Sequence, residues 1–211
     1  MPFHGHTKRE LPKKGGKKAV QRIWVSIRTP AYLGEKHLSD APCTAPEDLL
    51  GRTLEALLYD ITGDPAHSFM KLKFKITGVK GNECATDYWG HEISRDYITS
   101  ILRKGSSRVD AIFDVTTKDS YVIRVRTTII TRFRISTSKK RILRKGMVEL
   151  ISNKVPTLTL GQFAQEVAAG KVESDIYNFA KKVVRVKFTG ITKAKVLRRT
   201  LQVLTQSTTQ T

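Results

Sequence analysis

The clearest pattern in the chain is a two-residue alternation of apolar and basic side chains over residues 120–134. Successive side chains of a β-strand point to opposite faces of its sheet, so this alternation predicts a long strand with one core face and one arginine face. The predicted core face holds Tyr121, Ile123, Val125, Thr127, Ile129 and Phe133. The opposite face holds Arg124, Arg126, Thr128, Arg132 and Arg134.

Three shorter segments, residues 22–28, 71–76 and 184–188, repeat this design. In each of them apolar residues alternate with a face that carries Lys or Arg, as Leu72 and Phe74 alternate with Lys71 and Lys73. Four strands of this kind predict an antiparallel sheet or barrel with a cationic exterior.

A further strand over residues 108–117 precedes the long one, separated from it by a three-residue loop. A hairpin with this loop places Val115 opposite Ile123 and apolar residues opposite one another throughout. On the other face it places Asp114 opposite Arg124, an attractive cross-strand pair. We therefore expect Arg124 to be partly neutralised, while the later arginines of the strand remain free to bind anions.

Helical spacing of apolar residues predicts several helices. One follows the long strand from Lys139, with an apolar stripe formed by Ile142, Leu143, Met147, Leu150 and Ile151. Others are expected over residues 94–104, after the capping box Thr159-Leu-Gly-Gln162, and over residues 174–182. Residues 50–61 and 83–89 are predicted strands, and residues 29–48 a connection.

The predicted fold class is α+β, a mainly antiparallel sheet or barrel-like core with several packed helices and disordered basic termini. We expect a single α+β domain over residues 19–190. A disordered basic arm at residues 1–18 precedes it, and residues 191–211 follow as a tail that is first basic and then rich in Thr and Gln.

The charge balance indicates an anionic partner. The chain has 211 residues with 38 Lys and Arg against 19 Asp and Glu, a formal net charge of +19. Residues 120–148 hold nine Lys or Arg and no acid, whereas an ordinary solvated face mixes both signs. A nucleic acid or an anionic membrane would compensate this charge. The sequence has no apolar stretch long enough to span a bilayer and no signal or lipidation motif, so we expect a cytosolic protein with no membrane partner.

An enzymatic site is weakly supported. Asp87, His91, Glu92 and Asp96 form the best candidate cluster, since carboxylates can orient a histidine as a general base. No nucleophile motif accompanies them, and a polar cluster at the start of the 94–104 helix is the simpler interpretation. Cys43 and Cys84 lack metal-ligand spacing. We expect no enzyme activity, cofactor or metal.

Nucleic-acid binding by the basic residues is the better hypothesis, although charge alone does not separate RNA from DNA. Trp24, Tyr88 and Trp89 are candidates for stacking on unpaired bases. The basic residues expected to contact RNA are Lys8, Arg9, Lys13, Lys14, Lys17, Lys18, Arg22, Lys71, Lys73, Arg126, Arg132, Arg134, Lys139, Lys140, Arg141, Arg144, Lys145, Arg185, Lys187, Lys193, Lys195, Arg198 and Arg199.

The run Gly81-Asn-Glu-Cys-Ala-Thr-Asp-Tyr-Trp-Gly-His-Glu-Ile-Ser-Arg-Asp96 resembles the signature of the archaeal and eukaryotic ribosomal protein family called S-three-a. That signature reads Gly-x-x-Cys-x-Thr-x-aromatic-x-Gly-x-acidic-aliphatic-Ser/Thr-Arg-Asp. The similarity extends over residues 18–195. The chain ends soon after its last basic run, where eukaryotic members carry a long extension, and in this it resembles an archaeal member.

The resemblance implies a structural constituent of the small ribosomal subunit, on the platform near the mRNA exit. Expected partners are the 3′ region of the small-subunit rRNA and neighbouring platform proteins, with mRNA near the exit channel as a further candidate. The alternative is a free single-strand nucleic-acid-binding protein with an oligonucleotide-binding barrel.

Overall fold

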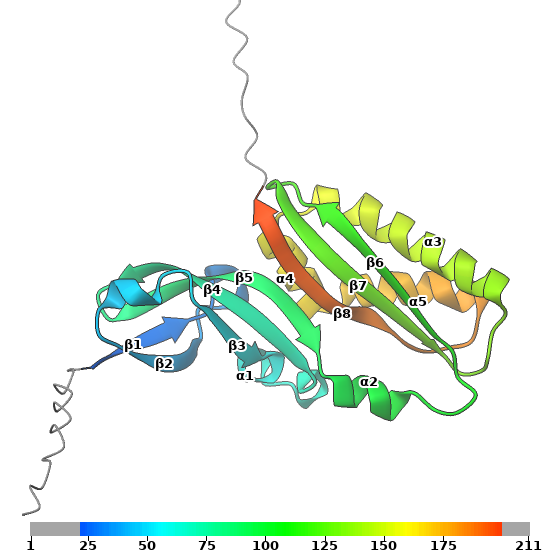
Figure 1. Ribbon diagram of the computed structural model, residues 1–211, viewed down its shortest axis with the longest axis horizontal. Coiled ribbons are helices and arrows are strands. Elements are labelled where there is room, and N and C mark those ends of the chain that lie inside the picture. The colour runs from blue at the N-terminus through cyan, green and yellow to red at the C-terminus, as the bar shows by residue number, and fades with distance from the viewer. Residues whose placement is uncertain (1–21, 200–211) are drawn as a thin grey trace, which may run out of the picture.

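The computed structural model describes residues 22–199 (Figure 1). The predicted arm at residues 1–18 and the Thr- and Gln-rich end of the tail lie outside the described residues. The strands are β1 (Ile23–Arg28), β2 (His37–Cys43), β3 (Thr53–Leu57), β4 (Met70–Lys80), β5 (Glu83–Ile93), β6 (Arg108–Thr116), β7 (Tyr121–Thr131) and β8 (Val186–Arg199). The α-helices are α1 (Leu58–Thr62), α2 (Arg95–Ile101), α3 (Thr137–Lys154), α4 (Leu160–Ala168) and α5 (Lys171–Val183).

The eight described strands form one open, branched sheet, which confirms the α+β class. The main path is β2-β1-β5-β8-β7-β6, while β4 pairs with β5 and β3 pairs with β4. All pairings are antiparallel except a short parallel contact between β1 and β5. β5 therefore joins two lobes, one built from β1–β5 and one from β6–β8 with α3, α4 and α5 (Figure 1).

The joint between the lobes is a short pairing of β5 with β8 at Gly90, His91 and Glu92. Gly90 has φ +152°, and a Cβ atom there would lie 2.3 Å from the Ala194 carbonyl oxygen. A side chain at this position would therefore separate the two strands. His91 is fully buried at the same joint.

The helices α3, α4 and α5 cover one face of the β6–β8 lobe and leave the other open (Figure 1). Leu143, Met147 and Ile151 of α3 are buried in a core that includes Ile123 and Val125 of β7. A smaller separate cluster lies in the other lobe, formed by Val25, Ile27, Cys43, Leu49, Ile76 and Cys84.

One end of the open face is covered by α2. Tyr97 of α2 stacks on Phe69, with ring centroids 3.8 Å apart, and packs edge-on against Phe188 of β8. Ile98 is buried, and so is Ile130 on the open face of β7. Further along the same face of β7, Arg124 and Arg126 are exposed.

The hairpin register predicted for β6 and β7 is confirmed, with Val115 opposite Ile123 and Asp114 opposite Arg124. The predicted strand is too long at its C-terminal end, because β7 ends at Thr131, whose hydroxyl group hydrogen-bonds to the Phe133 carbonyl oxygen (2.7 Å). Phe133, predicted to face the core, is 62% exposed.

Three other segments also differ from the predictions. Residues 29–48 contain the strand β2, and the segment predicted as a strand over residues 50–61 divides into β3 and α1. Residues 191–199, predicted as tail, form the second half of β8. Irregularities in the β7–β8 pairing, such as the one between Arg126 and Thr127, interrupt the alternation that would have predicted a long β8.

Candidate nucleic-acid interface

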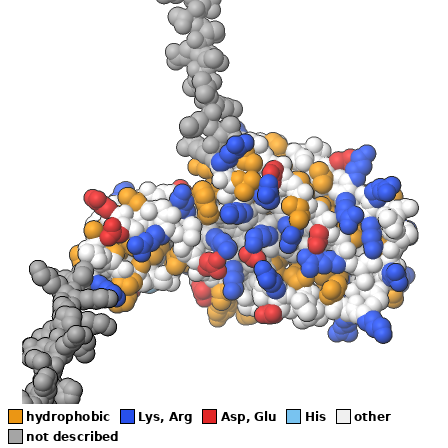
Figure 2. Space-filling model, viewed as in Figure 1, with side chains coloured by type: hydrophobic (Ala, Val, Ile, Leu, Met, Phe, Trp, Pro, Cys, Tyr) orange, Lys and Arg blue, Asp and Glu red, His pale blue; other side chains and the backbone are white. Residues whose placement is uncertain are grey.

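Four cations lie next to one another on the exposed part of the open face. Arg124 is paired in register with Lys195, and Arg126 with Lys193. Like charges directly opposite each other destabilise a sheet, so this arrangement costs the isolated protein free energy that an anion would recover. Lys and Arg side chains gather over this lobe in Figure 2.

Two of these four cations are compensated by carboxylates. Arg124 donates two hydrogen bonds to Asp114, at 2.7 and 2.9 Å, and the bond lowers the pKa of the Asp114 carboxyl group. The Lys193 ammonium lies 2.9 Å from a Glu92 carboxylate oxygen. Among residues 22–199, Arg126 and Lys195 have no ion pair. Of these four cations, they are the two that remain available to an anion.

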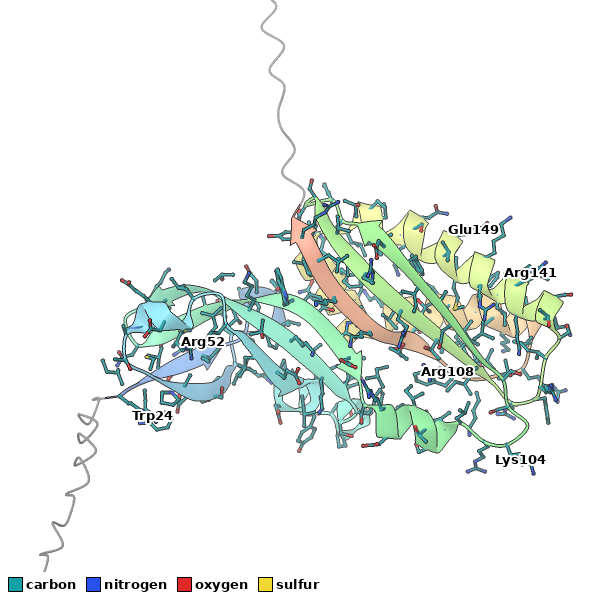
Figure 3. The ribbon with its side chains drawn as sticks, viewed as in Figure 1. Trp24, Arg52, Lys104, Arg108, Arg141 and Glu149 are labelled. Carbon is teal, nitrogen blue, oxygen red and sulfur yellow. The ribbon has the colours of Figure 1, made fainter. Side chains whose placement is uncertain are left out.

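A hollow of about 250 Å³ lies where α2 meets the open face. Its lining includes Arg95 from α2, Arg108 from β6, Arg126 from β7 and Lys193 from β8. Figure 3 labels Arg108 on the sheet. Arg95 and Arg108 are absent from the predicted site. Arg95 reaches it because α2 folds over the sheet, and Arg108 lies on β6, which pairs with β7.

Among the cations of β4, Lys73 is neutralised by carboxylates. Lys73 lies 2.7 Å from a Glu55 carboxylate oxygen and 3.8 Å from Glu92. The hydrogen bond with Glu55 raises the pKa of Lys73. Lys71 is exposed, but the hollow it lines also contains Glu55, Glu92 and Asp96. This surface is less suited to an anion than the sequence indicated.

The ridge that follows β7 is basic and exposed. Arg132 and Arg134 flank the exposed Phe133 in the loop before α3. On α3 the outward residues Lys139, Arg141, Arg144 and Lys145 are exposed and Lys140 is half-buried (Figure 3 labels Arg141 and Glu149). The Arg144 side chain donates to the Asp110 carbonyl oxygen of β6 (3.2 Å), so this ridge is joined to the edge of the open sheet.

The remaining predicted cations are more scattered. Arg185 is exposed. It lies beside the ridge, because its carbonyl oxygen accepts a hydrogen bond from the Arg132 backbone N–H (3.0 Å). The Lys187 ammonium is held by the Ile101 carbonyl oxygen at 2.5 Å. Arg22 and Arg198 are exposed. Lys8, Arg9, Lys13, Lys14, Lys17, Lys18 and the side chain of Arg199 lie outside what the structure describes.

The aromatic residues behave differently from one another. Tyr88 is fully buried, so its predicted stacking on bases is wrong. Trp89 is partly buried, with the Lys75 ammonium 4.4 Å from its ring centroid. Trp24 is 65% exposed at the outer end of the other lobe (Figure 3). Phe133 is the exposed ring nearest to the basic ridge.

The enzyme-like cluster is not assembled as an acid–base site. His91 is buried with one ring nitrogen 2.6 Å from the Tyr88 hydroxyl group and the other 3.0 Å from the Ile191 carbonyl oxygen. Burial lowers the pKa of His91 to about 4. Asp87 and Asp96 are exposed, and Glu92 is bound to Lys193. Within residues 22–199 no group of three or more His, Cys, Asp or Glu side chains is placed to hold a metal ion.

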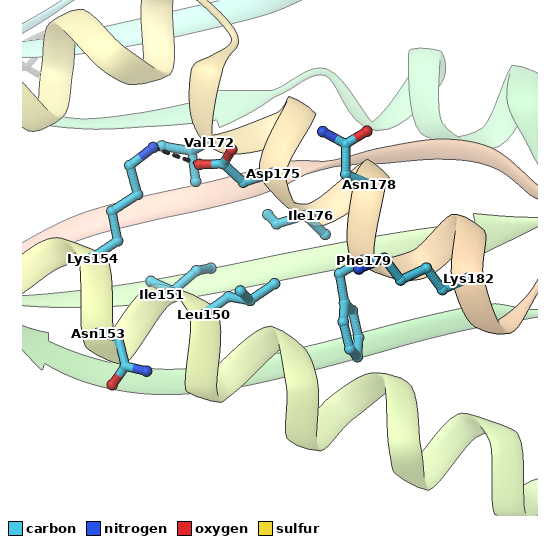
Figure 4. A pocket seen from close by; sticks show the side chains of 10 residues that line it. All are labelled: Leu150, Ile151, Asn153, Lys154, Val172, Asp175, Ile176, Asn178, Phe179 and Lys182. Carbon is cyan, nitrogen blue, oxygen red and sulfur yellow. Dashed lines mark hydrogen bonds and ion pairs between the residues drawn. The ribbon is translucent and has the colours of Figure 1, made fainter.

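A hollow of about 490 Å³ lies between α3 and α5 on the helical side (Figure 4). Its Lys154 is compensated by Asp175 at 2.6 Å and Glu166 at 2.9 Å. The floor is apolar, formed in part by Ile151 and Ile176. This hollow does not extend the cationic surface. None of the described helices is long and apolar enough to cross a membrane.

Comparisons with known proteins agree with the signature at residues 81–96. The model of the Ribosomal S3Ae family matches residues 12–200. The chain is 39% identical over 191 residues to the small ribosomal subunit protein eS1 of Saccharolobus solfataricus, covering 89% of this chain and 92% of the relative. It is 43% identical over 175 residues to the eS1 protein of Pyrobaculum aerophilum, covering 83% and 79%. The chain therefore belongs to the Ribosomal S3Ae family.

Proposed function

We propose that the chain is a structural constituent of the small ribosomal subunit that binds rRNA through its open sheet face and the basic ridge of α3. The observation that carries this proposal is the adjacent placement of Arg124, Arg126, Lys193 and Lys195 across β7 and β8. Its relatives are named small ribosomal subunit proteins, and a ribosome offers a permanent polyanion for this surface. A role in translation follows, with no enzymatic step, in the ribosomes of the cytoplasm.

The expected position of the protein is more specific. The family resemblance supports a place on the platform near the mRNA exit, beside the 3′ region of the small-subunit rRNA and other platform proteins. Within the chain, the open face, the ridge and the cations outside the described residues would contact rRNA phosphates. Phosphate contacts fix position and orientation and do not read sequence, which suits a protein that holds an already folded RNA.

A salt titration tests the mode of binding. Protein and purified small-subunit rRNA are mixed at increasing salt, and the logarithm of the binding constant is plotted against that of the salt concentration. Each neutralised phosphate contributes about −0.7 to −0.9 to the slope, and the proposal predicts a slope reflecting several phosphates. The double variant Arg126→Met, Lys195→Met should reduce the slope, whereas Lys104→Met in the loop after α2 should not. A flat dependence for the unaltered protein would contradict the proposal.

A further inference from the structure

The hollow between α2 and the open face has the properties of an anion-binding site. Its lining includes Arg95, Arg108, Arg126 and Lys193, with Glu92 as the one acidic member. These four cations come from four different elements, α2, β6, β7 and β8. Their meeting in one hollow therefore depends on the tertiary fold and does not follow from the periodicity of any one segment. A site built from rigid elements holds its donors in fixed positions.

Two of the four cations are already engaged. The Arg108 guanidinium group donates to Asp110 at 3.0 Å, and the Lys193 ammonium group lies 2.9 Å from Glu92. Burial raises the pKa of Glu92, but the bond and charge of Lys193, with the charges of Lys73 and Arg95, lower it overall. Glu92 is therefore an ionised carboxylate that is already bound.

The other two cations, Arg95 and Arg126, have no ion pair within residues 22–199. The hydroxyl groups in the lining do not compete with them as donors. Thr99 donates to the Arg95 carbonyl oxygen (2.9 Å), and Thr192 donates to the Arg126 carbonyl oxygen (3.1 Å). The two cations of this lining without an acidic partner among residues 22–199 are thus guanidinium groups, each of which presents paired N–H groups in a plane suited to phosphate oxygens.

The neighbouring hollow provides an internal comparison. It is lined by Lys71, Lys73 and Arg95 against Glu55, Glu92 and Asp96, so its charges balance. The α2 hollow has four positive charges and one negative. Its volume of about 250 Å³ is below the roughly 300–1,000 Å³ of sites for drug-sized ligands, which favours a single compact anion over a base or a nucleotide.

We propose that the α2 hollow binds one backbone phosphate of RNA between Arg95 and Arg126, with Arg108 at its edge. This inference rests on the proposed function and deepens it, because it identifies one fixed phosphate contact within a broader cationic surface. It also assigns roles to Arg95 and Arg108, which periodicity did not select. Removing Arg126 relieves repulsion with Lys193, so the variants are expected to remain folded.

The test uses the full chain, small-subunit rRNA and the variants Arg95→Met and Arg126→Met, alone and together. Each single variant should weaken binding about tenfold at fixed salt, the effect of losing a charged hydrogen bond, and reduce the salt slope by about one phosphate. Because both arginines hold the same phosphate, the double variant should lose little more slope than either single variant. Arg126→Lys should retain the slope and lose part of the affinity.

Lys104→Met is the matched control, since Lys104 is an exposed cation in the loop after α2 that lines neither hollow, and it should change affinity less than twofold. If the two Arg→Met variants resemble this control while the unaltered protein keeps a steep salt slope, the inference is overturned and the proposed function stands. A flat slope for the unaltered protein would instead overturn the proposed function. Inorganic phosphate is the second probe. If it raises the melting temperature through Arg95 and Arg126 while both variants bind rRNA normally, the site takes free phosphate, and the RNA assignment is wrong.

Discussion

Asp114 faces Arg124 across the β6–β7 pair and accepts hydrogen bonds from both Nε and Nη2 of its guanidinium group, at 2.7 and 2.9 Å. The pair is exposed to solvent, so it contributes little to folding stability. Its consequence is for binding, because a phosphate that approaches Arg124 must compete with a carboxylate already in place. Arg132 lies beyond the end of β7, and no described carboxylate pairs with it.

This difference predicts unequal effects on rRNA affinity. Arg132→Met should reduce affinity and lower the salt slope by nearly one phosphate. Arg124→Met should reduce the affinity and the salt slope by less, because the Asp114 carboxylate already partly neutralises the Arg124 charge. Filter binding at several salt concentrations measures the affinity and the salt slope of each variant, and melting temperatures serve as the folding control. Equal losses for the two variants would show that Asp114 does not shield Arg124.

Gly90 is predicted to be required for the joint between the lobes. Gly90→Ala places a Cβ atom 2.3 Å from the Ala194 carbonyl oxygen at a backbone φ that only glycine adopts easily. We expect a loss of about 2–4 kcal/mol in the free energy of unfolding, in the range of overpacking and backbone strain combined.

The matched control for this variant is Gly78→Ala in the neighbouring strand β4. Gly78 has an ordinary φ, and apart from its own residue and its two chain neighbours no described atom lies within 4 Å of the position its Cβ would occupy. Denaturant unfolding should therefore show little change for this variant. A comparable loss in both would mean that the close approach of β8 is not the reason for glycine at position 90.

His91 should make the protein sensitive to acid. Burial lowers its pKa from 6.5 to about 4, so the folded state favours neutral imidazole. The resulting stability is fully present above pH 6.5 and is lost as the pH falls toward 4, by about 3 kcal/mol. The unfolding free energy of the unaltered protein minus that of His91→Gln should fall by this amount between pH 7 and 4. A difference that stays constant over this range would contradict a buried neutral histidine.

Glu173 should have the opposite pH dependence. Its Oε1 atom is buried and has no hydrogen-bond partner among residues 22–199, and burial raises its pKa from 4.5 to about 7. The folded state favours the protonated carboxyl group, so this stability is fully present below pH 4.5 and is lost as the pH rises from there through 7. Glu173→Gln should be more stable than the unaltered protein at pH 8.5, by up to about 3 kcal/mol, with a smaller gain at pH 5. A gain independent of pH would show that Glu173 is not protonated in the folded protein.

The sequence predicts local pairing well and distant contacts poorly. The register of β6 and β7 follows from a short loop and two alternating strands, so Asp114 and Arg124 could be placed opposite each other. The end of β7 could not be predicted, since Phe133 continues the apolar parity although the chain has already turned at Thr131. The full length of β8 was hidden by irregular pairing with β7.

The candidate site divides in the same way. Arg126 was predicted from the basic parity of its strand and Lys195 from the basic tail, but their adjacency depends on β8 pairing with β7. Arg95 and Arg108 lie outside the apolar–basic alternation of the predicted strands, and they meet only because α2 folds over the sheet. Lys73 follows the basic pattern, yet the acidic partners Glu55 and Glu92 come from two other strands.

The central claim, that this protein is a constituent of the small ribosomal subunit, is tested most directly by sedimentation. An extract of the source cells is fractionated on a density gradient at low salt, and the protein is located with a specific antibody. It should sediment with the small subunits and leave them as the salt concentration is raised, because screening weakens its phosphate contacts. Recovery entirely in the slowly sedimenting soluble fraction at low salt would contradict the account.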